Sequence, residues 1–296
     1  MTPANITFIL NQIDSFPSLP ATVTRVMEIT GNPESSANDL MQAILPDQSM
    51  CVAILKTANS AFYGRPRTVA SIEEAIVVLG FQEIRNIILT QAIFNSFQKF
   101  RSANKNGIAA LWQHSLTCAL AARVIATHTH RLRPSASQLY IAGLIHDIGK
   151  VLMLIAMPSS GNQNFELGER LRYSFFPEEV NKFGISHDTV GMRLLNRWLF
   201  PEQLCLAVGY HHCPDQAPQG ATFPLIIQMA DILSQVLQSG EALDGEDIMK
   251  LIHDFAPGVI PLWGQYDLHW QATDINIWLA ELRAQLDDGA LFNLFN

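Results

Sequence analysis

The stretch AGLIHDIGKVLML, residues 142–154, places a histidine, an aspartate and a lysine in a run that is otherwise apolar or glycine. Uncharged neighbours on both sides favour a buried segment over a solvent-facing turn. Successive side chains of a regular helix diverge by roughly 100°, so His146 and Asp147 would share one ion only where the helix ends or is distorted. Gly149, directly after the pair, favours such a break. A metal site and a purely structural hydrogen-bonded role both remain open at this point.

Helical periodicity extends outward from this stretch in both directions, whereas sustained apolar and polar alternation is scarce. The predicted fold class is all-α. Residues that favour helix starts recur in the first part of the chain: Pro20, Ser35 or Ser36, Asp47, and Ser71 with Glu74. Gly80 should end the helix that Ser71 opens, and Phe81 should begin another that runs to Phe97. The N-terminal part is therefore expected to be a set of short helices.

The polar stretch KFRSANKNG, residues 99–107, is expected to be a connector near a subdomain boundary. Beyond it, helices are predicted at 107–127, 136–157 with a break near DIGK, 177–183, 187–199, 202–212 and 223–239. Residues 158–170 are expected to form a flexible loop, and residues 257–296 to add one amphipathic helix, ATDINIWLAELRAQL. The expected architecture is a two-part helical bundle with an N-terminal subdomain over 1–100, a second subdomain over 101–255 and a C-terminal helical extension over 256–296.

The composition narrows the classes of protein to consider. The chain has 296 residues, of which 48% are hydrophobic, and this is enough for a sizeable core. A formal charge of −8 with only 19 Lys and Arg argues against nucleic acid or an anionic membrane as the partner. No signal peptide is visible, and the longest apolar tract is broken by charges, so we expect a soluble, cytoplasmic protein. The cysteines show no CxxC pair, which favours reduced thiols; they are Cys51, Cys118, Cys205 and Cys213.

Further His and Asp residues fall on apolar helical faces. Imidazole and carboxylate bind divalent transition metals well, and helical bundles build cofactor sites from several facing helices. Each residue alone has an ordinary structural explanation, such as a hydrogen-bonded core histidine or a residue at a helix end. Their order along the chain is the stronger signal. The candidates are His114, His146 with Asp147, His187, His211 with His212, and Asp231.

This order resembles the H…HD…D pattern of the HD superfamily of metal-dependent phosphohydrolases. The resemblance covers about residues 107–240 and places His114, His146, Asp147 and Asp231 at the ligand positions of the superfamily. His187, His211 and His212 fall where the binuclear HD-GYP branch carries additional ligands. Lys150 matches a lysine that these enzymes place near phosphate. The segment HHCPDQAPQG lacks the HHE…GYP signature, which argues against cyclic-di-GMP as the substrate.

The first hundred residues are similar to the N-terminal half of HDOD domains, through FPSLPATVTRVMEIT, NSAFYG and AIVVLG. Together with WQHSLTCALAARVIA, YIAGLIHDIGKVLML and RWLFPEQLCLAVGYHHCP, the resemblance to HDOD proteins covers nearly all of residues 10–240. It implies a helical module of bacterial signalling and regulatory proteins, usually without demonstrated catalysis. HDOD members often lose the HD ligands, whereas this sequence keeps His or Asp at every such position.

Two functions therefore stand beside a purely structural alternative. The first is an HDOD signalling module that acts through contacts with a separate signalling protein, with an HD-like cavity that a metal could occupy. The second is a metal-dependent phosphohydrolase of a phosphodiester or nucleotide, in which Asp147 and Lys150 would serve catalysis. The metal set would be His114, His146, Asp147, His187, His211, His212 and Asp231, and Fe, Mn, Zn and Mg are all compatible with it. Whether the chain is an enzyme stays open at this point.

Overall fold

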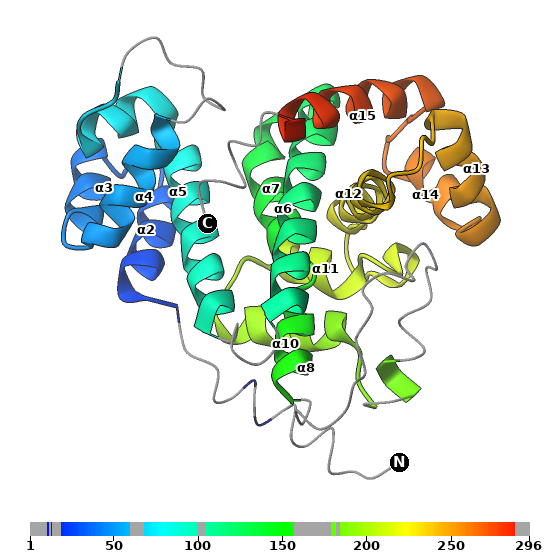
Figure 1. Ribbon diagram of the computed structural model, residues 1–296, viewed down its shortest axis with the longest axis horizontal. Helices are drawn as coiled ribbons and strands as arrows, with labels where there is room; N and C mark the ends of the chain where they lie inside the picture. Colours follow the sequence, from blue (N-terminus) through cyan, green and yellow to red (C-terminus); the bar gives the residue numbers. More distant parts are fainter. Residues whose placement is uncertain are drawn as a thin grey trace. The chain divides into compact units, whose positions relative to one another are not determined.

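A computed structural model describes residues 19–59, 68–99, 105–156, 179–181 and 184–287, together with Asn11 and Ile13. Within these residues all regular structure is helical, which confirms the predicted all-α class (Figure 1). The α-helices are α2 (Ala21–Gly31), α3 (Ala37–Ile44), α4 (Gln48–Ala58), α5 (Ile72–Lys99), α6 (Lys105–His128), α7 (Ala136–Ile145), α8 (Ile148–Ala156), α10 (His187–Arg197), α11 (Glu202–Tyr210), α12 (Thr222–Ser239), α13 (Gly245–Phe255), α14 (Val259–Gln265) and α15 (Ala272–Asp287). Short 3₁₀ helices occupy His130–Ser135 and Pro214–Gln216.

The chain divides into two compact units. The smaller unit consists of Pro17–Lys99 and Ala284–Asn296, and the larger unit consists of Met1–Phe16 and Phe100–Arg283. The division into 1–100, 101–255 and 256–296 stays a prediction. In the smaller unit, α5 packs against α2, α3 and α4. The expected caps are present: Ser36 forms a capping box with Asp39, and Asp47 accepts from the backbone N–H of Met50.

Gly80 interrupts α5 with φ 79° and ψ 166°, so the helix that begins at Ile72 and the one that ends at Lys99 meet at a kink. Glycine adopts this backbone conformation without the steric strain of a side chain. Within α5, Ile72–Asn95 is long and apolar enough to cross a membrane by length and composition alone, and 56% of its most apolar window is buried inside the protein. A core helix of a helical unit has the same properties, and a cytoplasmic location stays a prediction.

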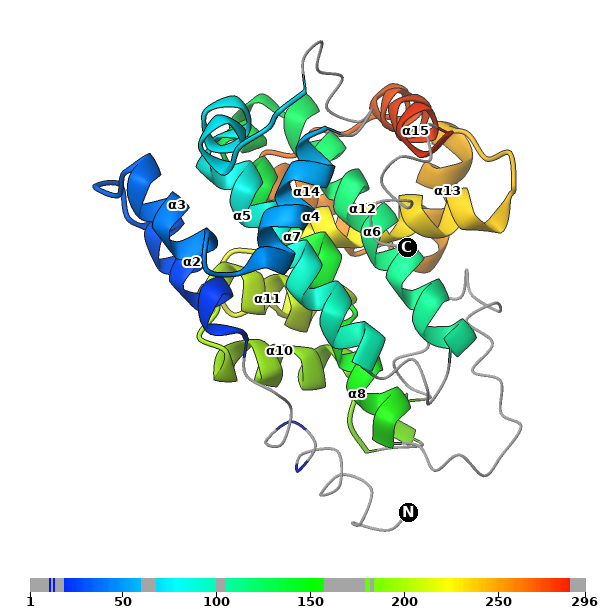
Figure 2. The ribbon, with the colours of Figure 1, turned by 60° about the vertical axis from the view of Figure 1, so that its left-hand side comes forward.

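The larger unit is built around α6, α7 and α12. Helices α6, α7 and α12 pack against one another, with the most extensive contact between α6 and α7 (Figures 1 and 2). Helices α8, α10 and α11 form the neighbouring layer, in which α10 contacts both α8 and α11. Nearly every residue of α7 from Leu139 to Ile145 is buried, and so is most of α12. Because α7 is buried on all sides, its sequence is apolar around the full circumference of the helix.

The helical break predicted at the HD pair lies at the pair itself. Helix α7 ends at Ile145 and α8 begins at Ile148, so His146 and Asp147 occupy the junction. At Gly149, just after the pair, the backbone of α8 contacts the backbone of α10. A Cβ atom at residue 149 would lie 1.9 Å from the carbonyl oxygen of His187. This close approach requires a glycine.

The C-terminal prediction of a single helix was incomplete. Besides α15, the last forty residues contain α14, in which Pro261 and Gly264 weaken the local helix signal. Helix α13 lies before these residues and was not predicted either. Trp263, Trp270 and Trp278 pack against one another, with ring centroids 5.2 and 5.5 Å apart. Burial of these rings explains how α14 forms despite its weak local propensity. The predicted loop at 158–170, most of the helix at 177–183 and much of the connector at 99–107 lie outside the described residues.

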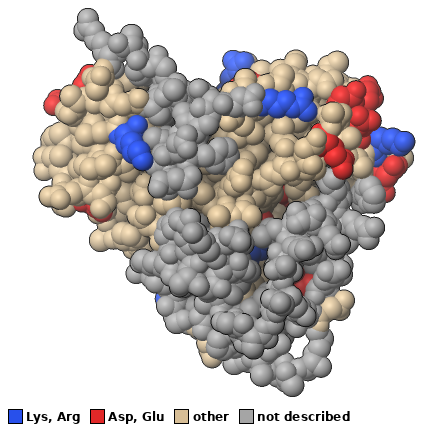
Figure 3. Space-filling model, viewed as in Figure 1, with Lys and Arg blue, Asp and Glu red and all other residues tan. Residues whose placement is uncertain are grey.

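The described surface carries few basic side chains. On the face seen in Figure 3, Lys and Arg are scattered, while Asp and Glu gather toward the region of α13 and α15. Exposed acidic residues of this region include Glu241, Asp244, Glu246 and Asp247. This distribution agrees with the formal net charge of −8.

Leu199 is a strained position on the surface of the larger unit. It follows α10 with φ 58° and is 87% exposed. The backbone N–H of Phe200 donates to the carbonyl of Leu195, as in a helix end that normally uses glycine. We expect Leu199→Gly to stabilise the protein by about 1 kcal/mol, because a left-handed conformation costs a residue with Cβ about that much. Urea unfolding measures the change, and a variant less stable than the wild type would contradict it.

Candidate metal centre

Five segments of the larger unit bring the predicted ligand residues together. His114 lies in α6, His146 and Asp147 lie at the α7–α8 junction, and His187 begins α10. The other candidates lie at the end of α11 and in α12; they are His211, His212 and Asp231. All are buried except His212, which is half-buried. They form two groups, and within each group the ligand atoms lie within 4.8 Å of one another.

The Asp231 group consists of His114, His146 and Asp231. His114 Nε2 lies 3.2 Å from His146 Nε2 and 3.1 Å from Asp231 Oδ1. His146 Nε2 lies 3.8 Å from the same carboxylate oxygen. Two imidazole nitrogens and one carboxylate oxygen therefore face a common point between α6, the α7–α8 junction and α12.

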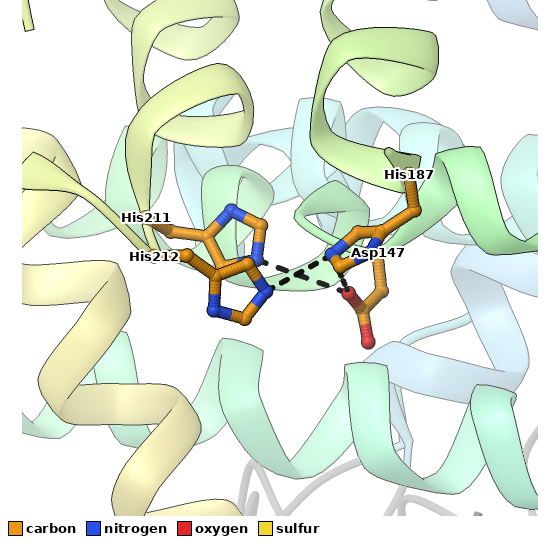
Figure 4. A group of neighbouring side chains, drawn as sticks. All are labelled: Asp147, His187, His211 and His212. Atoms are coloured by element: carbon orange, nitrogen blue, oxygen red, sulfur yellow. Dashed lines mark hydrogen bonds and ion pairs between the residues drawn. The ribbon is translucent and has the colours of Figure 1, made fainter. Parts of the chain in front are cut away.

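The Asp147 group consists of Asp147, His187, His211 and His212. Figure 4 shows the histidines at the end of α11 pointing across toward His187 and Asp147. His187 Nε2 lies 3.1 Å from Asp147 Oδ1 and 3.0 Å from His212 Nε2. His211 Nε2 lies 3.9 Å from Asp147 Oδ1.

Asp147 connects the two groups because its two oxygens face different sides. Oδ1 faces His187 and His211, while Oδ2 lies 3.4 Å from His146 Nε2 and 3.6 Å from His114 Nε2. The side chain is only 1% exposed. One buried carboxylate therefore stands between two sets of imidazoles, an arrangement suited to a shared ligand of two ions.

Hydrogen bonds on Nδ1 turn the Nε2 atoms of His114, His146 and His211 inward. His146 Nδ1 lies 2.8 Å from the carbonyl of Gly143, and His211 Nδ1 lies 2.8 Å from the carbonyl of Val208. A carbonyl only accepts, so both Nδ1 atoms carry the hydrogen. Ser234 Oγ donates to the carbonyl of His114, and it therefore accepts from His114 Nδ1, 3.0 Å away. This is how metal-ligating histidines are commonly held.

Burial keeps three of these imidazoles neutral near pH 7. Burial lowers the pKa of His146, against the opposing effect of Asp147 and Asp231. Burial, followed by the neighbouring His146 and His187, lowers the pKa of His211 to about 3. The pKa of His212 is also held well below its usual value, mainly by burial and then by His211. Neutral imidazole is the form that coordinates metal.

The carboxylates and the neighbouring cations ionise each other. Burial works against the charge of Asp147, but His146 and Lys150 hold its pKa well below the usual value. Burial likewise opposes ionisation of Asp231, but a hydrogen bond and the electrostatic interaction with His114 lower its pKa. Glu179 and Asp147 raise the pKa of His187 to about 9 against the effect of burial, so a metal ion that binds His187 Nε2 displaces a proton from it. The centre thus holds two carboxylates that are anionic at neutral pH.

A divalent cation fits the side chains present. His211 Nε2 is buried without a hydrogen-bond partner, although an unsatisfied buried polar atom is unfavourable. In the Asp231 group, His146 Nε2 carries a lone pair, and it faces His114 Nε2 together with the Asp231 carboxylate oxygen. These electron-rich atoms would repel one another, so a proton or a metal cation must lie among them. The described residues therefore form a His/Asp cluster that can hold a metal ion.

Lys150, the other predicted catalytic residue, lies at the edge of this centre. Its Nζ donates to Asp147 Oδ2 at 2.6 Å, and its side chain is 19% exposed. Burial opposes its charge, but Asp147 and Asp231 raise the pKa of Lys150 above the ordinary value. An ammonium group is therefore held beside Asp147.

Sequence reasoning missed the residues that hold the ligands. Glu179 accepts from both the ring and the backbone of His187, Ser234 holds His114, and Gln235 donates to both oxygens of Asp231 at 2.9 Å. The spacing of Asp231, Ser234 and Gln235 on α12 was available as a signal, since residues three and four apart share a helix face. Glu179 has no such signal, because it comes from a different part of the chain.

The fold and the site define an all-α protein with a buried His/Asp centre at the meeting of five helical segments. The HDOD domain model matches residues 16–214, about two thirds of the chain, so this protein belongs to the HDOD family. The match ends before α12, and Asp231 therefore lies beyond the matched residues although the fold brings it into the centre.

A curated protein from Treponema pallidum (strain Nichols), described as uncharacterized, is 24% identical over 211 residues. The alignment covers 71% of this chain but only 40% of that relative. An HDOD domain protein of unknown function from Geobacter sulfurreducens has a similar structure, with a TM-score of 0.62, 23% identity, and 94% and 98% of the two chains covered.

Two further solved structures share the fold. A protein from Shewanella amazonensis SB2B, provisionally named a phosphohydrolase, superposes with a TM-score of 0.69 at 16% identity and covers 98% of each chain. A protein from Marinobacter aquaeolei VT8, provisionally assigned to signal transduction, superposes with a TM-score of 0.71 at 19% identity, over 99% of this chain and 66% of that one. At these identities the likeness establishes the fold alone.

Proposed function

We propose that this protein is an HDOD regulatory module whose centre holds divalent metal ions and which acts through contacts with a separate signalling protein in the cytoplasm. The observation that carries the metal is the inward orientation of the imidazole Nε2 atoms around Asp147 and Asp231, with the outer nitrogens held by hydrogen-bond acceptors. The membership in the HDOD family supports the regulatory role.

Each of the two groups would supply the ligands for one ion. In the Asp231 group they are His114, His146 and Asp231, with Asp147 Oδ2 beside them. In the Asp147 group they are Asp147, His187, His211 and His212. Imidazole and carboxylate together suit Fe, Mn and Zn, and the carboxylates also suit Mg.

Metal analysis of the full chain tests this proposal. Protein purified without chelator is expected to contain up to one Fe, Mn, Zn or Mg ion per group, because both groups offer buried, ionised ligands. Inductively coupled plasma mass spectrometry measures the content. Absence of all of these metals, also after incubation with each ion and removal of the excess, would favour a purely structural role for the cluster.

A second candidate is a metal-dependent phosphohydrolase acting on a phosphodiester or nucleotide. Lys150 favours it, since a charged and partly exposed ammonium group beside the ligand carboxylates can neutralise a phosphate. A bound divalent ion supplies Lewis-acid chemistry toward a phosphoryl oxygen. The chain's own contribution would be to orient the phosphate through Lys150 and to keep Asp147 ionised.

A phosphoesterase screen with added Mn²⁺ or Fe²⁺ separates these two candidates. If the protein is an enzyme, Lys150→Met is expected to lower the rate of hydrolysis about 100-fold, because one electrostatic contact to the phosphate is lost. Metal content measured on the same sample should stay near that of the wild type. Lys250→Met, on the exposed face of α13, is the matched control. A metal-loaded protein that hydrolyses no phosphoester would leave the regulatory module as the better account.

A further inference from the structure

Glu179 makes two hydrogen bonds to one candidate ligand. Its Oε2 accepts from the backbone N–H of His187 at 2.8 Å and from the ring Nδ1–H of the same residue at 2.7 Å. Glu179 is 1% exposed and His187 is fully buried. One carboxylate oxygen therefore binds both the main chain and the side chain of His187, which fixes the position and the rotation of the imidazole together.

The contact also replaces a missing helix cap. His187 is the first residue of α10, and the N-cap residue Ser186 makes no side-chain capping hydrogen bond because its hydroxyl donates to Asp188. Glu179 instead accepts one of the free N–H groups at the helix start, where the helix dipole favours a negative charge. The carboxylate is thus anchored from the main chain and does not depend on the imidazole alone.

On His114, His146 and His211, the group hydrogen-bonded to Nδ1 is uncharged. The acceptors for His146 and His211 are backbone carbonyls, and the acceptor for His114 is the hydroxyl of Ser234. A carboxylate acceptor increases the electron density of the ring and makes the opposite nitrogen a stronger ligand than a neutral acceptor does. Among the imidazoles whose Nδ1 partner is described, His187 therefore has the most strongly enhanced Nε2.

We propose that Glu179 is a positioning residue for the Asp147 group: it holds His187 Nε2 toward Asp147 and His212 and thereby sets the affinity of this group for a divalent ion. This inference rests on the proposed function, because it requires an ion in the centre. Glu179 acts through His187, and its own Oε2 is occupied by the two N–H groups of that residue.

The test is a titration of metal-free full-length protein with Mn²⁺ and, separately, Zn²⁺, followed by isothermal calorimetry or competition with a chelating dye. Glu179→Gln keeps the shape of the side chain and removes its charge. We expect this variant to bind an ion 10–100-fold more weakly in the Asp147 group, and less than about 3-fold more weakly in the Asp231 group. His187→Gln and His114→Gln each remove a ligand from one group and identify its binding step. Glu202→Gln, an exposed carboxylate in the first turn of α11, is the matched control.

A double variant distinguishes positioning from a general structural role. If Glu179 acts through His187, Glu179→Gln should weaken metal binding no further in a His187→Gln background. Additive effects in the double variant, equal weakening of both groups, or unchanged affinities beside a lower melting temperature would each overturn the inference. A wild type that binds no ion would overturn both this inference and the proposed metal centre. A wild type that binds two ions, with Glu179→Gln indistinguishable from it, would overturn the role of Glu179 alone.

Discussion

Asp147→Asn is expected to abolish metal retention in both groups at once. The two oxygens of this carboxylate face different groups, so the loss of its charge removes a ligand from each. The weakening should exceed the roughly 10–100-fold effect of losing a residue that only supports a ligand. Metal content after dialysis, and the titration curve of the metal-free variant, measure the effect. If the phosphohydrolase alternative is correct, activity should disappear together with the metal.

The same substitution should also destabilise the metal-free protein. Asp147 is the acceptor for Lys150 at 2.6 Å and lies 3.1 Å from His187 Nε2, so Lys150 would lose its carboxylate partner and His187 one of its two. Removing one member of a buried ion pair costs about 3–5 kcal/mol. Asp267→Asn serves as the control, because this exposed carboxylate pairs with Arg131 and His269 far from the centre's ligands in sequence. Retention of one full equivalent of metal by Asp147→Asn would show that the two groups do not share this ligand.

Gly149→Ala is expected to be the most damaging small substitution in the larger unit. Its Cβ would lie 1.9 Å from the carbonyl oxygen of His187 and 2.8 Å from the backbone nitrogen of Gly191. Backbone atoms cannot rotate away, so α8 and α10 would have to separate. We expect a loss of about 3 kcal/mol or more, at or above the upper end for overpacked cores, measured by urea unfolding.

The separation of α8 and α10 should also reach the centre. Residue 149 contacts the residue that carries one ligand and lies two positions after Asp147, so the distance from His187 to Asp147 should increase. Metal affinity of the Asp147 group should therefore fall more than that of the Asp231 group. The control is Gly264→Ala in α14, where an added Cβ meets nothing within 4 Å and where stability should stay the same or rise by up to about 1 kcal/mol. Wild-type stability of Gly149→Ala would refute the close approach.

Much of the fold followed from local signals. Ser36 and Asp47 act as helix N-caps as predicted, because an N-cap depends on one or two neighbouring residues. The break at His146 and Asp147 was also predictable, since a regular helix would have turned the two side chains apart. Helices α13 and α14 were not predicted; the formation of α14 depends on packing of Trp263 against Trp270, a tertiary contact that local helix signals do not show.

The residues of the candidate site were predictable from the sequence, but the contacts among their side chains were not. Buried His and Asp in an otherwise apolar sequence pointed to a shared partner, and the structure places these residues in two neighbouring groups. The sequence does not say that Asp147 faces both groups, because this depends on the side-chain rotation at a helix junction. Glu179 was not found, since nothing in the stretch PEEVNKFG distinguishes it from its neighbour Glu178. Its role arises only from the approach of residues 179–181 to the start of α10.

The distribution of the centre over the chain links occupancy to folding. His114 and Asp231 are separated by most of the length of the larger unit, yet their side-chain atoms lie 3.1 Å apart. An ion held there would close long stretches of chain into loops, as a cross-link does, and would lower the entropy of partly opened states. Any ion that binds the folded state alone adds about 2.7 kcal/mol of stability at a hundredfold excess over its dissociation constant. The concentration of metal in the cell would then control the fraction of this unit that is folded and able to bind a partner, even if the protein turns over no substrate.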